Sequence, residues 1–118
     1  MARRLYAAGL EGLQPDGSLI YEVHTDGTVD TDRHWWVQAE SVVGNLWAWK
    51  YLAVPEGYGR AVKAWEYISR NIVDRVDGEW WWKCDAEGRP DRAADKAGEW
   101  KCPYHNARMC LQVLGIFD

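Results

Sequence analysis

His105 is placed where a histidine can transfer a proton. It follows Pro103, a residue type favoured in the first turn of a helix, so it belongs to the start of the last predicted helix. The partial positive charge at a helix N-terminus disfavours imidazolium, and a neutral imidazole can act as a general base toward a C–H acid. Trp100, on the preceding loop, is close enough in sequence to form a stacking wall beside it. A histidine that merely caps or packs locally is the alternative.

A second group of reactive and aromatic side chains lies between Asp32 and Glu40. Trp36 and Glu40 are one helical turn apart and share a face, so an aromatic platform and a carboxylate could point into one cavity. In the alternative interpretation Trp35 is a core residue, Asp32 caps the helix and Glu40 is solvated.

The aromatic composition indicates a class of ligand. Nine Trp and six Tyr accompany a single Phe, whereas core packing would draw on Phe just as readily. Trp and Tyr combine a flat apolar face with a polar edge, which suits a sugar ring that needs both stacking and hydrogen bonds. Some of these Trp side chains are simply large core residues in the alternative view.

Charge and cysteine content exclude several other classes. The net charge is −4 and the basic residues form no stripe, so neither nucleic acid nor an anionic membrane surface is an expected partner. No apolar run approaches membrane-spanning length, and we expect a cytoplasmic protein. The three cysteines suit a reducing compartment better than a disulfide framework.

Other catalytic signatures are missing. The sequence has no phosphate-binding loop, no dinucleotide fingerprint, no nucleophile elbow and no specific carboxylate pair. The three histidines lack the tight spacing of metal ligands, so we expect no metal site. They are His24, His34 and His105.

Two long helices are expected in the middle of the chain. Residues 32–52 carry one apolar face, formed by Trp35, Ala39, Val42, Leu46 and Trp49. A polar stripe follows the same rhythm: His34, Gln38, Ser41 and Asn45. Residues 58–73 bury Ala61, Trp65, Ile68 and Ile72. Their opposite face is predicted to be solvated, with Glu66 and Arg70 as an i,i+4 pair, and comprises Lys63, Glu66, Arg70 and Asp74.

Shorter elements surround these helices. Residues 2–8 end a helix, residues 16–28 form a hairpin with Asp-Gly turns, and residues 77–84 form an aromatic strand before a turn at 85–90. A polar loop, 91–99, leads to the last helix, which is expected to direct Ala107, Leu111, Leu114 and Phe117 inward. A mainly α chain whose helices alternate with short β-hairpins suggests an α/α barrel rather than a bundle.

Two segments resemble a known family. Residues 32–40 (Asp-Arg-His-Trp-Trp-Val-Gln-Ala-Glu) and 100–106 (Trp-Lys-Cys-Pro-Tyr-His-Asn) resemble the C-terminal motifs of the N-acylglucosamine 2-epimerase/cellobiose 2-epimerase family. The likeness is strongest to its cellobiose 2-epimerases. Residues 78–82 (Gly-Glu-Trp-Trp-Trp) resemble the strand between those motifs. The resemblance covers essentially the whole chain, and its most specific part is Trp-Lys-x-Pro-Tyr-His-Asn.

The resemblance implies that residues 1–118 form a C-terminal fragment of an (α/α)6 barrel. Members of the family remove the C2 proton of a ring-opened reducing sugar, pass through an enediolate, and return a proton to the opposite face. Two histidines serve as acid and base, and His105 matches the later one. Trp100 resembles a sugar-stacking Trp, and Trp36, in preference to Trp35, resembles a second. No cofactor is implied, because the substrate's own carbonyl acidifies the C2 proton.

The other catalytic histidine and an arginine of the family lie upstream of the matched motifs, and neither His24 nor His34 replaces them. We therefore expect a cofactor-independent sugar 2-epimerase fragment that is inactive alone, acting on a reducing disaccharide, a monosaccharide or an N-acylated sugar. A non-catalytic sugar-binding or assembly module and a mannose-type aldose–ketose isomerase fragment are the alternatives. Helices without their barrel neighbours also predict exposed apolar patches or self-association.

Overall fold

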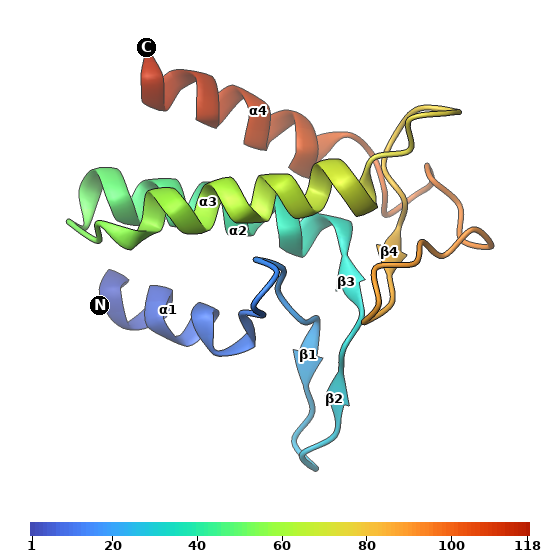
Figure 1. Ribbon diagram of the computed structural model, residues 1–118, viewed down its shortest axis with the longest axis horizontal. Coiled ribbons are helices and arrows are strands. Elements are labelled where there is room, and N and C mark those ends of the chain that lie inside the picture. The colour runs from blue at the N-terminus through green and yellow to red at the C-terminus, as the bar shows by residue number, and fades with distance from the viewer.

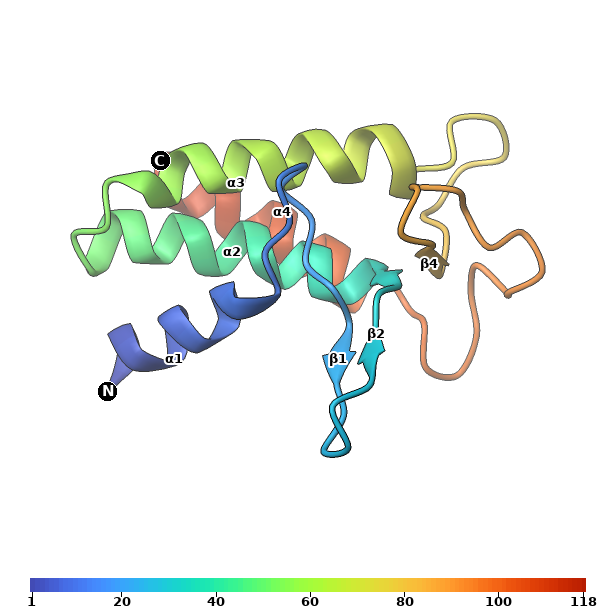
Figure 2. The same ribbon diagram turned by 60° about the horizontal axis from the view of Figure 1, so that its bottom comes forward.

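Four helices run in alternating directions in the computed structural model of residues 1–118 (Figures 1 and 2). They are α1 (Ala2–Gly9), α2 (Trp35–Tyr51), α3 (Glu56–Tyr67) and α4 (Tyr104–Phe117), and the other three pack around α2. The hairpins lie at the end where α2 and α4 begin, whereas both chain termini and the α2–α3 connection lie at the opposite end (Figures 1 and 2). The mainly α fold agrees with the sequence prediction.

Helix α2 is the centre of the packing. It contacts both α3 and α4, and nine of its seventeen residues are buried. The predicted apolar face is buried from Trp35 to Leu46, but Trp49 is 37% exposed. Much of the polar stripe is buried as well, because Gln38 bonds the backbone of Leu19 and Asn45 bonds Ser41. Buried polar groups of this kind need such partners.

Helix α3 confirms part of its predicted pattern. Ala61, Ile68 and Ile72 are buried, whereas Trp65 is 44% exposed. No ion pair joins Glu66 to Arg70. Arg70 lies in a π-helical turn, Ile68–Ile72, which changes the side-chain spacing after Tyr67. Asp74 was expected to face the solvent, but it is buried and forms an ion pair with Lys96. Asp74 lies beyond that turn, where the Lys96 side chain reaches it from the later loop.

The prediction for the last helix was wrong. Met109 and Ile116 face the core, whereas the residues predicted to point inward are exposed: Ala107, Leu111, Leu114 and Phe117. Apolar residues occupy more than one face of α4, so periodicity alone does not decide which face packs. Helix α2 covers the face with Met109 and Ile116 and leaves the other one open.

Two small hairpins connect the helices. Strand β1 (Glu22–Val23) pairs with β2 (Val29–Asp30), and β3 (Arg33–His34) pairs with β4 (Lys83–Cys84), both antiparallel. The Asp-Gly turns are confirmed: Gly17 and Gly27 adopt φ +89° and +85°, a region that favours glycine. Strand β3 runs directly into α2, so the β3–β4 pair fixes where that helix starts. Within the aromatic segment 77–84 only the last two residues form a ladder.

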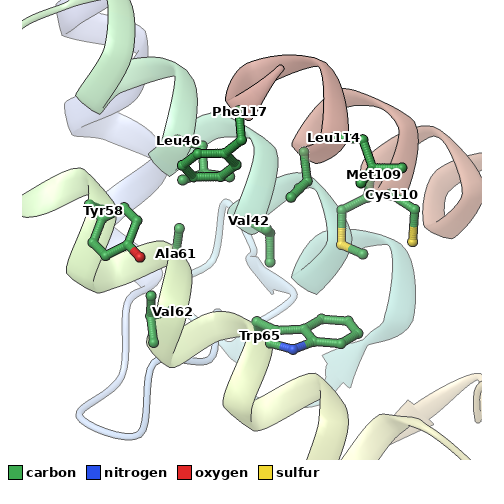
Figure 3. A pocket seen from close by; sticks show the side chains of 11 residues that line it. Val42, Leu46, Tyr58, Ala61, Val62, Trp65, Met109, Cys110, Leu114 and Phe117 are labelled. Carbon is green, nitrogen blue, oxygen red and sulfur yellow. The ribbon is translucent and has the colours of Figure 1, made fainter.

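An apolar groove runs between α3 and α4, with α2 as its floor (Figure 3). Its volume is about 370 Å³, and all eleven lining residues are hydrophobic. Trp65, Leu114 and Phe117 remain 44–62% exposed along it. These exposed side chains confirm the predicted apolar patch, whereas self-association stays a prediction. None of the helices has the length and apolar character needed to cross a bilayer.

Candidate functional site

The second turn of α2 and the first turn of α4 meet and bring two distant polar residues into contact. Nδ1 of His105 lies 2.7 Å from Oε1 of Glu40, and the same oxygen accepts a hydrogen bond from Arg108. Glu40 lies one turn into α2, and Arg108 lies one turn after His105 on α4. All three side chains are about one third exposed, so the cluster is open to solutes.

The charge of Glu40 determines which nitrogen of the neutral His105 ring carries the proton. Burial of the Glu40 carboxyl favours its neutral form, but hydrogen bonds from Arg108 and His105 outweigh that effect and lower the pKa of Glu40. The hydrogen bond to Glu40 also raises the pKa of Arg108. An ionised carboxylate only accepts hydrogen bonds, so Nδ1 of His105 must donate to it. In the neutral ring, Nε2 is then the free basic nitrogen.

Aromatic rings surround His105 on three sides. The Trp35 ring meets it edge to face at 5.4 Å between centroids, Tyr104 does the same at 4.9 Å, and Trp36 lies tilted at 5.7 Å. Trp35 is 2% exposed and acts as a wall, whereas Trp36 is 37% exposed and keeps part of its face free. Of the two residues, Trp36 is therefore the one that can stack on a solute.

A hollow of about 250 Å³ adjoins this cluster between α1 and α2. Trp36 and Glu40 line it together with Ser41 and Asn45, so it offers an aromatic face beside polar groups. Such a mixture suits a polyhydroxylated ligand. The larger groove between α3 and α4 has no charged or amide side chain in its lining, and we do not assign the chemistry to it.

Tyr21 extends the aromatic surface beyond what the sequence indicated. Its ring stacks on His34 at 3.9 Å and meets Trp36 edge to face at 6.2 Å. Burial lowers the pKa of His34. Tyr21 precedes β1, and the β1–β2 hairpin carries it to the start of α2. Its contact with Trp36 depends on that chain reversal, and no spacing in the sequence signals it.

Trp100 is 82% exposed on the loop before α4. The rings that contact His105 are those of Trp35, Trp36 and Tyr104, so Trp100 does not form the wall beside the histidine. An exposed indole at this place has its whole face available to a solute. A stacking role for Trp100 stays a prediction.

One group of side chains has the composition of a metal site. The ligand atoms of Asp30, Asp32 and His34 lie within 4.8 Å of one another. The Lys83 ammonium already lies 2.6 Å from Oδ2 of Asp32, and that hydrogen bond raises the pKa of Lys83. We therefore assign Asp32 to an ion pair that ties β4 to the strand before α2. His24, the remaining histidine, lies near Glu22 on the exposed hairpin.

Comparison with known proteins shows a likeness to sugar epimerases and isomerases. Residues 1–108 match the profile of the N-acylglucosamine 2-epimerase (GlcNAc 2-epimerase) family. A cellobiose 2-epimerase from Bacteroides fragilis is 47% identical over 98% of this chain and 30% of its own length. The structure of cellobiose 2-epimerase from Spirochaeta thermophila superposes with a TM-score of 0.91 at 39% identity, over 98% of this chain and 29% of its own.

A D-mannose isomerase from Marinomonas mediterranea is more distant, at 31% identity over 83% of this chain and 25% of its own length. The chain thus spans 25–30% of the length of these curated relatives. The cellobiose 2-epimerase structures are (α/α)6 barrels, and the four helices correspond to one part of such a ring. The fold implied by the sequence resemblance is confirmed.

Proposed function

The chain belongs to the N-acylglucosamine 2-epimerase family, and we propose that it supplies one of two proton-transfer groups of a sugar 2-epimerase, namely His105. The observation that carries the proposal is the 2.7 Å contact between Nδ1 of His105 and Glu40. This contact supports a histidine whose Nε2 is free to act as a base, beside the exposed face of Trp36. Residues 1–118 would form the C-terminal part of the epimerase barrel.

The reaction begins with a ring-opened reducing sugar. Nε2 of His105 takes the proton from C2, and the electron pair of the broken C–H bond moves toward the C1 carbonyl to give an enediolate. The carbonyl already acidifies this proton, so the substrate needs no cofactor to form the anion. A second acid–base group, supplied by the rest of the barrel, returns a proton to the opposite face of C2 and inverts that carbon.

Each neighbouring residue has a role in this scheme. Glu40 holds the Nδ1–H of His105 and stabilises the imidazolium that forms when Nε2 takes the proton. Arg108 keeps Glu40 ionised. Trp36 and Trp100 would stack on the sugar, and Trp35 would support the histidine from the protein side. These roles follow from the exposure of each ring and from its contacts.

A chimera tests the proposal. In it, this chain replaces the matching 30% of the Bacteroides fragilis cellobiose 2-epimerase. The chimera is incubated with cellobiose in D₂O, and we expect deuterium at C2 together with the C2 epimer. The His105→Ala variant should lose both, whereas His24→Ala, which alters an exposed hairpin histidine, should keep them. Exchange at the parental rate by His105→Ala would refute the role of His105.

The 118-residue chain alone is the second arm of the experiment. Because one of the two proton-transfer groups would come from outside these residues, we expect no epimerisation by the isolated chain. Product formation by the purified chain would contradict that expectation. A non-catalytic sugar-binding or assembly module would instead leave the chimera inactive while the chain still bound sugar.

Aldose–ketose isomerisation is the second candidate reaction, because a D-mannose isomerase is among the relatives. The same product analysis detects it. In an aldose–ketose isomerase the enediolate is protonated at C1, which yields a ketose. The higher identity to the Bacteroides fragilis cellobiose 2-epimerase favours epimerisation. A ketose as the main product of the chimera would reverse this preference.

A further inference from the structure

Lys101 carries an ammonium group that lies inside the protein. The residue is 2% exposed. Its Nζ donates to the carbonyl oxygens of Trp80 and Lys96, each at 2.5 Å, and lies 3.4 Å from Oε1 of Glu79. Burial lowers the pKa of Lys101, while the charge of Glu79 acts in the opposite direction. A buried ammonium is stable only where acceptors and a counter-charge surround it, as they do here.

The same ammonium contacts the wall behind His105. It lies 5.2 Å from the centroid of the Trp35 ring, a distance typical of a cation–π interaction. The Trp35 ring in turn packs edge to face against the His105 ring. Lys101 therefore supports the histidine indirectly, through one intervening aromatic ring.

Glu79 provides a second link to the start of α4. Its Oε1 also accepts a hydrogen bond from Nδ2 of Asn106, at 3.2 Å, and Asn106 is the residue after His105. Glu79 adopts φ +64°, a backbone conformation that is uncommon for a residue with a side chain. Its carbonyl oxygen accepts the amide of Asp74, which stabilises that conformation. The turn thus presents a carboxylate to Lys101 and Asn106 together.

We propose that Lys101 is a positioning residue that, together with Glu79, fixes the first turn of α4 so that His105 reaches Glu40. Lys101 does not act as a nucleophile, because its three acceptors and its burial keep Nζ away from any solute. Its importance for catalysis rests on the proposed function of His105. The effect on the His105 ring can be measured in the chain itself.

The test is an NMR measurement on the 118-residue chain with ¹⁵N-labelled histidine. In the parent, His105 should show a protonated Nδ1 and an unprotonated Nε2. Lys101→Met keeps the length of the side chain but removes the ammonium, so we expect a mixture of the two tautomers and about tenfold faster exchange of the Nδ1 proton. Lys101→Arg retains the positive charge and should recover part of the parental signal.

Lys96→Met is the matched control. Lys96 lies on the same loop and bonds Asp74 and the carbonyl oxygen of Gly78, but its ammonium contacts neither Trp35 nor Glu79. This variant should be less stable and yet keep the His105 signals of the parent. An equal change in both Met variants would indicate general loosening of the loop and would overturn a specific role of Lys101.

Unchanged His105 signals in a folded Lys101→Met variant would also overturn the proposal. Should that variant fail to fold, Glu79→Gln decides, because it keeps the size of the side chain and removes the counter-charge. We expect the same change of signals to a smaller extent, and unaltered signals would refute the proposal. An inactive parent chimera alongside altered Lys101→Met signals would reject the proposed function and leave the positioning role intact.

Discussion

Nδ1 of His105 and Oε1 of Glu40 lie 2.7 Å apart, although 65 positions separate the two residues in the sequence. The contact joins the second turn of α2 to the first turn of α4, and these are the two segments with the most reactive side chains. The contact also orients the imidazole: Nδ1 faces the carboxylate of Glu40, and Nε2 remains available to a solute. The sequence predicts Glu40 as a substrate-binding residue, and the contact adds the prediction that Glu40 also orients His105.

Glu40→Gln should therefore impair proton transfer more than sugar binding. A glutamine has nearly the shape of glutamate, but it is neutral and can donate as well as accept, so it no longer enforces the Nδ1–H tautomer. By analogy with carboxylates that orient a catalytic histidine, we expect kcat of the chimera to fall by about 10²- to 10⁴-fold. KM should change little. Deuterium exchange at C2 measures the effect.

Glu66→Gln is the control for that variant, because Glu66 lies on α3 and forms no ion pair. It should retain the parental kcat. A parental kcat in Glu40→Gln would mean that the carboxylate is dispensable and that the His105–Glu40 contact only stabilises the fold.

Local patterns predicted those features of the site that depend on neighbours in sequence. The start of α4 at Pro103 and the shared face of Trp36 and Glu40 follow from helix geometry, and the structure has both. The contact between Glu40 and His105 is a different case. Each residue was singled out separately, but their pairing depends on how α2 and α4 pack.

Residues that act through tertiary contacts were missed for the same reason. Arg108 is one turn beyond His105 and resembles any solvated helix residue until α2 brings Glu40 to it. Tyr21 reaches Trp36 only because the β1–β2 hairpin folds back. The prediction of the buried face of α4 was wrong because apolar residues occupy more than one face of this helix, and packing against α2 decides which of them is buried.

Trp35 and Trp36 are adjacent but should respond differently to substitution. Trp35 is 2% exposed, so Trp35→Ala should lower the free energy of unfolding by about 3–5 kcal/mol. Trp36 is 37% exposed, and Trp36→Ala should cost about 1 kcal/mol or less while raising KM of the chimera. Urea unfolding and steady-state kinetics provide the two measurements.

Trp47→Ala is the matched control for Trp36. Trp47 lies on the same helix at 49% exposure, and its ring contacts Tyr51 rather than His105. Its substitution should leave KM unchanged. The assignment of Trp36 as a stacking residue fails if Trp36→Ala and Trp47→Ala have the same KM.

The apolar groove between α3 and α4 should make the isolated chain self-associate. Exposed apolar surface of this kind is normally covered, and here Leu114 and Phe117 leave more than half of their surface in water. We expect Leu114→Lys or Phe117→Lys to shift the chain toward the monomer in sedimentation velocity. Val76→Lys places the same charge on a residue that is 89% exposed and outside the groove. This control variant should not shift the chain toward the monomer. A parent chain that stays monomeric at high concentration would contradict this prediction.

Asp74 should make stability depend on pH in the acid range. Hydrogen bonds from Lys96, at 2.7 Å, and from the amide of Val76 lower the pKa of this carboxyl to about 2, from an ordinary value of 3.8. A depressed pKa means that the folded state binds the proton less tightly than the unfolded state. The stabilisation by the ionised carboxylate is therefore complete above about pH 4 and is lost as the pH falls toward 2.

Asp74→Asn removes this contribution and tests its sign. At pH 7 the variant should unfold at lower urea than the parent, and the difference should shrink between pH 4 and pH 2. Asp77→Asn, at an exposed position of the same turn, should show no such pH-dependent difference. If the deficit of Asp74→Asn is as large at pH 2 as at pH 7, ionisation of Asp74 is not its cause. The contact between Asp74 and Lys96 would then stabilise the loop before α4 through hydrogen bonding and packing rather than through charge.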